Sequence, residues 1–216
     1  HYMLVLARES NGTGQTALLL PCDRAGISLR HYTTYDGRNC SDVTFSDVQA
    51  LAIDVVGSRG GGHELVGQAM ERAYVALACE AAGAMRSAYT MTLDYARTRK
   101  QFGRVLTANQ AYQHALVDMY VAVEEAQGLA QHASMALLQS DRPAARWASG
   151  AKAFACADGR LLGEQAVQLH GAIGMTEDYG VGRYYKRLAA IANQYGDADW
   201  HLLRIRELEG DEDHGK

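Results

Sequence analysis

The segment LDYARTRKQFGRVL, residues 93–106, gathers basic side chains where a helical pattern stops. Arg97, Arg99, Lys100 and Arg104 flank the step Phe102-Gly103. A guanidinium beside a flexible glycine turn can hold a pyrophosphate through paired hydrogen bonds, and an aromatic ring can stack on a planar group. Cations at a helix C-terminus also complement the helix dipole, and glycine is a common helix stop. The dipole explains the charge, but it does not explain the aromatic ring at the break.

A second candidate segment is QLHGAIGMTEDYGVGRYYKR, residues 168–187. Gly171 and Gly174 end a predicted helix and expose backbone N–H groups, which lets a phosphate or ribose approach the main chain. The alternative is an ordinary helix-turn-helix corner, with Thr176 or Glu177 near the next helix start. The glycines do not form the dinucleotide fingerprint of a βαβ unit.

A third candidate segment is QYGDADWHLLR, residues 194–204. Asp197 and Asp199 precede an apolar helical run, which is typical of helix capping and of favourable charge in a first turn. A carboxylate of this segment, or His201, is the alternative candidate for a general base.

The remaining polar residues indicate no metal site and no serine-nucleophile site. The other histidines lack paired ligand spacing, and no nucleophile elbow is present. The four cysteines are far apart, which favours reduced thiols and a cytoplasmic protein over disulfides or zinc. They are Cys22, Cys40, Cys79 and Cys156.

Charge and hydropathy exclude further classes of partner. A net charge of -4 and a pI near 6.1 argue against a nucleic-acid or anionic-membrane surface, so any anion site must be a local cluster. No apolar run approaches the roughly 20 residues that span a bilayer, and no signal peptide is visible. The chain starts with HYMLVLARE, which reads as the middle of a strand, so we expect it to begin inside a domain.

The pattern changes near residue 50. Short apolar runs separated by Gly, Asn and Asp predict antiparallel strands before it, too few for an independent sheet. Beyond it, two apolar stripes at helical spacing predict long helices, a third helix has Pro143 near its first turn, and two shorter helices follow. The expected fold is α+β, mainly α. It has a partial antiparallel β-domain over 1–56, an antiparallel helical bundle over 57–209 and a disordered tail over 210–216. The stripes are Tyr74, Leu77, Ala81, Met85, Ala88, Thr92 and Tyr95, and then Leu116, Met119, Val123, Ala126, Ala130, Ala133 and Leu137.

These motifs together resemble the acyl-CoA dehydrogenase family. YARTRKQFG followed by NQAYQHALVDM is similar to one family signature, and QLHGAIGMTEDYGVGRYYKR is similar to its Gln-x-x-Gly-Gly-x-Gly segment. The resemblance covers about residues 1–209, with the opening strands similar to the second half of the family's middle β-domain. It implies an FAD-dependent α,β-dehydrogenation of an acyl-CoA thioester, a reaction of lipid metabolism. It also implies a homo- or heterotetramer of homologous subunits, with electron-transfer flavoprotein as acceptor.

In the family the flavin lies between subunits, and the resemblance assigns FAD contacts to seven positions. Arg99 and Phe102 match positions that hold FAD in one subunit. Gln168 and the loop from Gly171 to Gly174 match positions that reach a flavin held mainly by the neighbour. Ala172 replaces a glycine of the family pattern. The full set is Arg99, Gln101, Phe102, Gln168, Gly171, Ala172 and Gly174.

The chain departs from the family at the catalytic base. Many members carry Glu in a Tyr-Glu-Gly step, but here Gly196 occupies the Glu position of Tyr195-Gly196-Asp197. A second family solution corresponds to Ala73, and Glu71 faces elsewhere on a helix.

Three explanations are open for this departure. A partner subunit supplies the Glu; Asp197, or less readily Glu71, replaces it; or the chain has another flavin reaction or no activity. A structural partner without catalysis and a plain helical bundle without cofactor are the alternatives to an enzyme. Fatty, branched and sterol acyl groups all remain candidate substrates, and loss of the Glu side chain suggests space for a bulky one.

Overall fold

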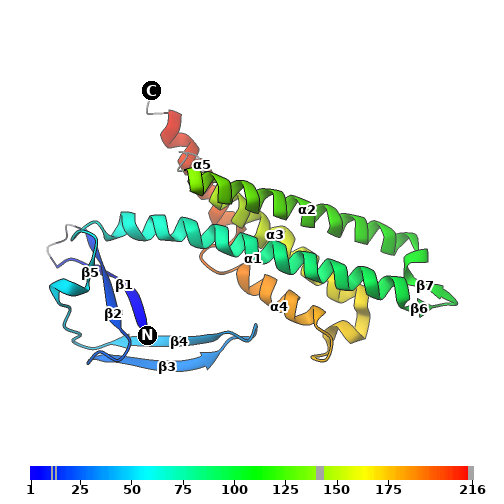
Figure 1. Cartoon of the computed structure of the whole chain (residues 1–216), viewed down its shortest axis with the longest axis horizontal. Coiled ribbons are helices and arrows are strands. Elements are labelled where there is room, and N and C mark those ends of the chain that lie inside the picture. Colours follow the sequence, from blue (N-terminus) through cyan, green and yellow to red (C-terminus); the bar gives the residue numbers. More distant parts are fainter. Residues whose placement is uncertain (11, 13, 140–143, 214–216) are drawn as a thin grey trace. The chain divides into compact units, whose positions relative to one another are not determined.

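The computed structural model describes residues 1–10, 12, 14–139 and 144–213 (Figure 1). The chain divides into two compact units, His1–Met70 and Glu71–Lys216. Helix α1, Gly62–Thr98, begins in the first unit and continues through the second. Its first residues therefore group with the strands, although the sequence pattern assigns them to the helical domain.

The first unit contains two small antiparallel sheets. β1 (Tyr2–Arg8), β2 (Gln15–Pro21) and β5 (Val55–Val56) form one sheet in the order β1-β2-β5, and β3 (Ile27–Thr33) pairs with β4 (Asn39–Phe45). The four long strands lie where the apolar runs predict them, whereas the two-residue β5 is too short to give a sequence signal. β2 buries Ala17 and Leu20, but no residue of β3 or β4 is buried within the described unit.

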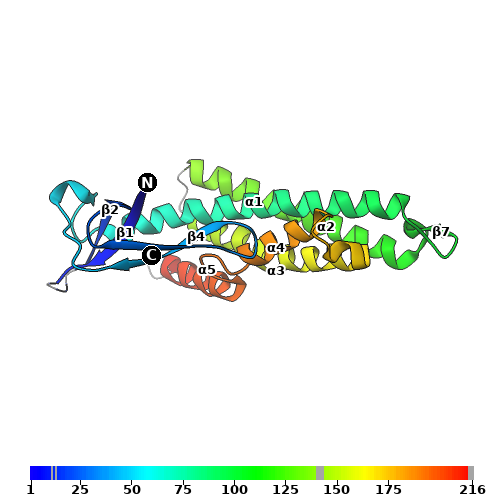
Figure 2. The same ribbon diagram turned by 90° about the horizontal axis from the view of Figure 1, so that it is seen from below.

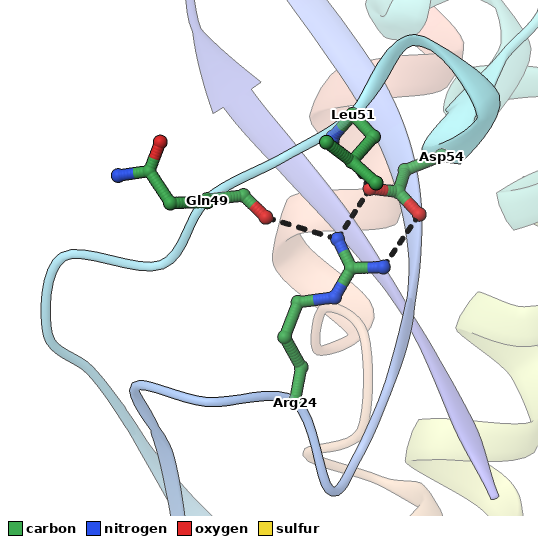
Figure 3. A network of polar contacts seen from close by, with 4 residues as sticks. All are labelled: Arg24, Gln49, Leu51 and Asp54. Atoms are coloured by element: carbon green, nitrogen blue, oxygen red, sulfur yellow. Dashed lines mark hydrogen bonds and ion pairs between the residues drawn. The ribbon is translucent and has the colours of Figure 1, made fainter.

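An ion pair closes the segment that follows β4. The Arg24 guanidinium donates to both carboxylate oxygens of Asp54, with Nη2 and Oδ1 2.8 Å apart, and also to the carbonyl oxygen of Gln49 (Figure 3). The Leu51 amide donates to the same carboxylate. The hydrogen bond from Arg24 makes the largest contribution to lowering the pKa of Asp54, and the bond from the Leu51 amide comes next. Together they explain how the fold accommodates a carboxylate that is only 6% exposed.

The glycines of SRGGGHE have a packing role at the start of α1. A Cβ atom at Gly62 would lie 2.5 Å from the backbone nitrogen of Ala17 in β2, and the Gly60 amide donates to the Thr16 hydroxyl at 2.9 Å. The segment therefore lies directly against the sheet and is more than a spacer between elements.

The second unit is an antiparallel helical bundle (Figures 1 and 2). α1 is followed by α2 (Gln110–Gln139), α3 (Ala144–His170), α4 (Val181–Ile191) and α5 (Ala198–Asp213). α3 packs against α2, α4 and α5, and its many Ala and Gly residues permit this close approach. Both predicted stripes line the core, except that Tyr95 and Leu137 at their ends are only half-buried.

The end of the chain differs from the prediction of a disordered tail over 210–216. α5 continues to Asp213, so residues 210–213 are helical, and 214–216 lie outside the described residues. Pro143, predicted near the first turn of α3, also lies outside them. No helix within the described residues is long and apolar enough to cross a membrane.

Candidate functional site

The basic segment after α1 folds as a tight hairpin. β6 (Lys100–Gln101) pairs with β7 (Arg104–Val105), and Phe102 and Gly103 form the two-residue loop with φ angles of 54° and 79°. Two positive φ angles are typical of the type I′ turn, which favours Asn and Gly. A phenylalanine at the first position is therefore strained, and such strain is most often found where function requires it.

The side chains of this hairpin face solvent. Phe102 is 97% exposed. Arg99 is also exposed, and its guanidinium forms no hydrogen bond or ion pair with any described residue. Backbone bonds fix its place, since its amide donates to Tyr95 and its carbonyl accepts from Leu106 at 3.0 Å. A guanidinium without a partner among the described residues, carried on a fixed backbone near an exposed ring in the sequence, can bind an anionic aromatic ligand.

In the glycine-containing loop after α3, the space around Gly171 is empty, whereas Gly174 is packed against neighbouring atoms. Gly171 has a φ of 65° and nothing within 4 Å of a Cβ position, so its backbone can be approached from outside. Gly174 is buried, and a Cβ there would lie 2.8 Å from the carbonyl oxygen of Val167. Gln168 and Ala172 are exposed.

Two tyrosines bring the hairpin end of α1 and the loop after α3 to the same end of the bundle (Figure 1). The Tyr112 hydroxyl, near the start of α2, donates to the carbonyl oxygen of Leu169 at 3.1 Å. Tyr95, near the end of α1, stacks on His170 with ring centroids 4.6 Å apart. The structure therefore joins two motifs that lie far apart in the sequence.

The third candidate segment follows the C-terminal end of α4, whereas the glycine-containing loop precedes the N-terminal end of that helix. Tyr195 and Gly196 form a turn with φ angles of 59° and 102°, directly before α5. Asp197 Oδ1 accepts a hydrogen bond of 2.9 Å from the Trp200 amide, and its carbonyl accepts one from the His201 amide. These contacts place Asp197 at the N-cap of α5, which is the helix-capping role that the sequence pattern offers as one alternative for this aspartate.

Lys152 on α3 fixes this turn, a role that the sequence reasoning missed. The side chain is fully buried, and its Nζ donates to the carbonyl oxygens of Ile191 at 2.9 Å and Gly196 at 3.1 Å, and to Cys156 Sγ at 2.9 Å. Three donors thus meet three acceptors. The available signal was a lysine inside a stripe of small residues, with Ala148 and Cys156 one turn to either side.

His201 is a core histidine in this structure. It is fully buried, and neither ring nitrogen has a hydrogen-bond partner among the described residues. Burial, and then the positive charges of Lys152 and Arg204, lower its pKa to about 4. Its ring packs edge-on against Tyr74 at 4.7 Å. The imidazole is neutral at pH 7, but no substrate can reach it because it is fully buried. This favours a packing role over that of a general base.

Glu71, the other carboxylate considered for the base, takes part in an ion pair. Arg204 Nη2 lies 3.1 Å from Glu71 Oε1, and the same guanidinium donates to the Ser149 hydroxyl at 2.6 Å. The pair links the second unit's first residue to α5 and α3, so its geometry is that of a structural contact.

Comparison with known proteins identifies the family. The family model described as "Acyl-CoA dehydrogenase, C-terminal domain" matches residues 60–207. The chain belongs to the acyl-CoA dehydrogenase family. The chain is 30% identical over 173 residues to the probable acyl-CoA dehydrogenase YngJ of Bacillus subtilis, and the match covers 78% of this chain and 45% of that protein. It is 27% identical over 182 residues to the human mitochondrial short-chain specific acyl-CoA dehydrogenase, covering 83% and 44%.

Solved acyl-CoA dehydrogenase structures share this fold. The Tcur3481-Tcur3483 steroid ACAD variant is 27% identical, with a TM-score of 0.87 over 99% of this chain and 56% of that one. Butyryl-CoA dehydrogenase from Megasphaera elsdenii, at 23% identity, has a TM-score of 0.87 over 95% and 55%. The chain therefore spans about half the length of the relatives that it matches. The family finding confirms the predicted resemblance and fold class.

Proposed function

We propose that this chain is a subunit of an FAD-dependent acyl-CoA dehydrogenase that forms the α,β double bond of an acyl-CoA thioester. The observation that carries the proposal is the meeting of two exposed motifs at one end of the bundle. These are the hairpin with Arg99 and Phe102 and the open loop at Gly171. Family membership supplies the reaction class.

The residues at this end fit an FAD. Arg99 offers an unpaired guanidinium that matches a diphosphate, with Gln101 beside it on the hairpin as a further polar contact. Phe102 offers an exposed ring for stacking. At the second loop, Gly171 leaves its backbone open, Gln168 is an exposed polar side chain, and Gly174 holds the loop close to α3. Bound FAD supplies the acceptor of the hydride that leaves the β-carbon of the substrate.

The base is the part of the reaction that this chain does not supply. Asp197 Oδ1 already accepts the Trp200 amide as a helix cap, and Glu71 is paired with Arg204. A general base must reach the α-proton directly or through one water, and its loss costs about 10²–10⁴ in rate. We therefore assign the catalytic Glu to a homologous partner subunit of a hetero-oligomer.

The names of the relatives suggest the acyl class of the substrate, and the free cysteines suggest the cellular compartment. Among the relatives, the human protein is named as short-chain specific and one solved structure as a steroid ACAD variant, so these two acyl classes are tested first. Electron-transfer flavoprotein is the proposed acceptor. The four cysteines are free, in keeping with a reducing compartment, and we propose the cytoplasm.

The visible spectrum of the purified assembly tests cofactor binding. The chain is expressed alone and with homologous partner chains, and the flavin absorbance is recorded for each. Anaerobic bleaching by short-chain, branched and steroid-side-chain acyl-CoA then tests the reaction. Bound flavin, with bleaching only when a partner is present, is expected. Absence of flavin from every preparation would overturn the proposal.

A Cβ atom at Gly196 would lie 2.6 Å from Cε3 of Trp200, so this position has no room for a side chain. This observation favours one second candidate, a structural partner that stabilises a catalytic subunit and binds no substrate. Arg99→Ala in the co-purified complex separates the two. Unchanged flavin content in that variant supports the structural role, whereas lost flavin supports a subunit that contributes to the cofactor site.

A further inference from the structure

Position 196 is closed to any side chain in this structure. A Cβ atom built on Gly196 would lie 2.6 Å from Cε3 and 3.0 Å from Cδ2 of Trp200, and 3.3 Å from Nε2 of His201. The φ of 102° is a further obstacle, because L-residues rarely adopt it. The sequence suggests that loss of the Glu side chain frees space at position 196, but in the structure the indole ring of Trp200 lies there.

Trp200 is held in this place from several directions. Its amide is fixed by the Asp197 cap, and its ring packs edge-on against His201 at 4.8 Å and Tyr74 at 6.1 Å. The obstacle at Gly196 is thus the edge of an indole ring that is 45% exposed, and turning the ring away from Gly196 would give up its contacts with His201 and Tyr74.

The backbone of the turn is equally constrained. Lys152 donates to the Gly196 carbonyl from the buried side, and the Ile191 carbonyl at the end of α4 shares the same ammonium. The turn cannot swing outward to make room for a side chain without breaking a buried hydrogen bond. Glycine is required here by the packing of this chain as well as by its backbone angles.

We propose that Trp200 is the residue that excludes a carboxylate from position 196, so that restoring Glu there without removing the ring cannot restore a base. The inference rests on the proposed function for its catalytic meaning, because position 196 matches the family's base. The steric closure itself is a property of the fold and is measurable without flavin or substrate.

A double-mutant cycle on the assembled protein measures the closure. Gly196→Ala is expected to lower the Tm by roughly 5 °C or more beside Trp200, because it adds a collision to the backbone strain. In a Trp200→Ala background, the same substitution is expected to cost no more than half of that shift. Trp200→Leu serves as a second background that keeps apolar volume in case the alanine variant does not fold.

The matched control is Gly171, which also has a positive φ but open space around its Cβ position. Gly171→Ala and Trp200→Ala should shift the Tm additively. Equal Tm shifts for Gly196→Ala with and without the indole would overturn the closure, whatever the flavin experiments give.

Introducing the carboxylate tests the inference at the level of function. Gly196→Glu is expected to lower the Tm more than Gly196→Ala, and Gly196→Glu with Trp200→Leu is expected to recover most of that loss. No recovery would contradict the role of Trp200. If the mutations are coupled but the chain turns over acyl-CoA without any partner, the closure stands and the assignment of the base to a partner subunit is rejected.

Discussion

The ammonium of Lys152 lies 3.1 Å from the carbonyl oxygen of Gly196, 44 residues along the chain. The contact joins α3 in the bundle interior to the turn before α5 that contains Gly196. Because Lys152 is fully buried, its charge is solvated by Ile191, Gly196 and Cys156 in place of water. The turn before α5 is therefore a fixed part of the core.

Lys152→Met is expected to destabilise the bundle by about 1–3 kcal/mol. The substitution keeps most of the volume but removes the ammonium donor from the Gly196 carbonyl, at a cost of about 1–3 kcal/mol, whereas the Ile191 carbonyl still accepts from the Gln194 amide. Relief of a buried charge offsets part of the loss. Urea unfolding measures the loss. Lys186→Met is the control, since Lys186 is 40% exposed and pairs with exposed Glu177, and it should change stability by less than about 1 kcal/mol. A Lys152→Met protein as stable as the parent would contradict this account of the turn.

Asp197→Ala should behave as loss of a helix cap. We expect a cost of about 0.5–2 kcal/mol in unfolding free energy and a rate of acyl-CoA oxidation in the assembly that changes little. A rate loss of about 10²-fold or more would instead identify Asp197 as the base. Asp199→Ala, in the first turn of the same helix, is the control for the stability effect. Full activity of this chain alone with an intact rate in Asp197→Ala would exclude both Asp197 and a partner as the source of the base.

The long elements could be predicted from the sequence because burial has a helical period. Almost every residue of the two stripes on α1 and α2 is buried, from Tyr74 to Thr92 and from Leu116 to Ala133. The strands β1 to β4 were equally visible as apolar runs between turn residues. Position along the sequence also placed the two exposed loops correctly at helix ends.

Phe102 should be replaceable with a gain in stability and a loss of flavin. Asn tolerates a positive φ, so Phe102→Asn is expected to stabilise the flavin-free protein by about 1 kcal/mol. Loss of ring stacking should weaken FAD binding roughly tenfold. Thermal unfolding and flavin titration measure the two effects. Gly103→Ala is the opposite control, because its φ of 79° penalises a side chain. Tighter flavin binding by Phe102→Asn would contradict a stacking role for the ring.

His201 should make the bundle sensitive to acid. Its pKa of about 4 in the folded protein lies below the ordinary value of 6.5, so the unfolded state binds the proton first as pH falls. This contribution to stability is complete above pH 6.5 and is lost as the pH falls from 6.5 towards 4, with a total of about 3 kcal/mol. Burial lowers the pKa of His170 as well, so it acts in the same direction.

His201→Leu is the variant that tests this dependence. It removes the titrating group, and the slope of unfolding free energy between pH 6.5 and 4 should become shallower, leaving the part due to His170. His114→Leu, which changes an exposed histidine of α2 by the same substitution, is the control variant. An unchanged slope in His201→Leu would show that this imidazole does not titrate with the fold.

The tertiary contacts of the turn could not be predicted, because each joins residues far apart in the chain. A lysine in an alanine-rich helix gives no sign of which carbonyl groups it will reach, and Gly196 gives no sign that Trp200 covers it. For the same reason His201 appeared as a candidate base in the sequence, and only its burial and its contact with Tyr74 indicate a core residue. The helical residues 210–213 were missed because their polar composition resembles that of a disordered tail.

Flavin content of the assembled protein with and without the Arg99 guanidinium tests the central claim most directly. Arg99→Ala should lose most of the bound FAD, because a diphosphate would lose its paired hydrogen bonds. Arg97→Ala removes a like charge from the same helix end and should retain the FAD. Equal flavin in Arg99→Ala and the parent, or no flavin in the parent, would contradict a cofactor site at this end of the bundle.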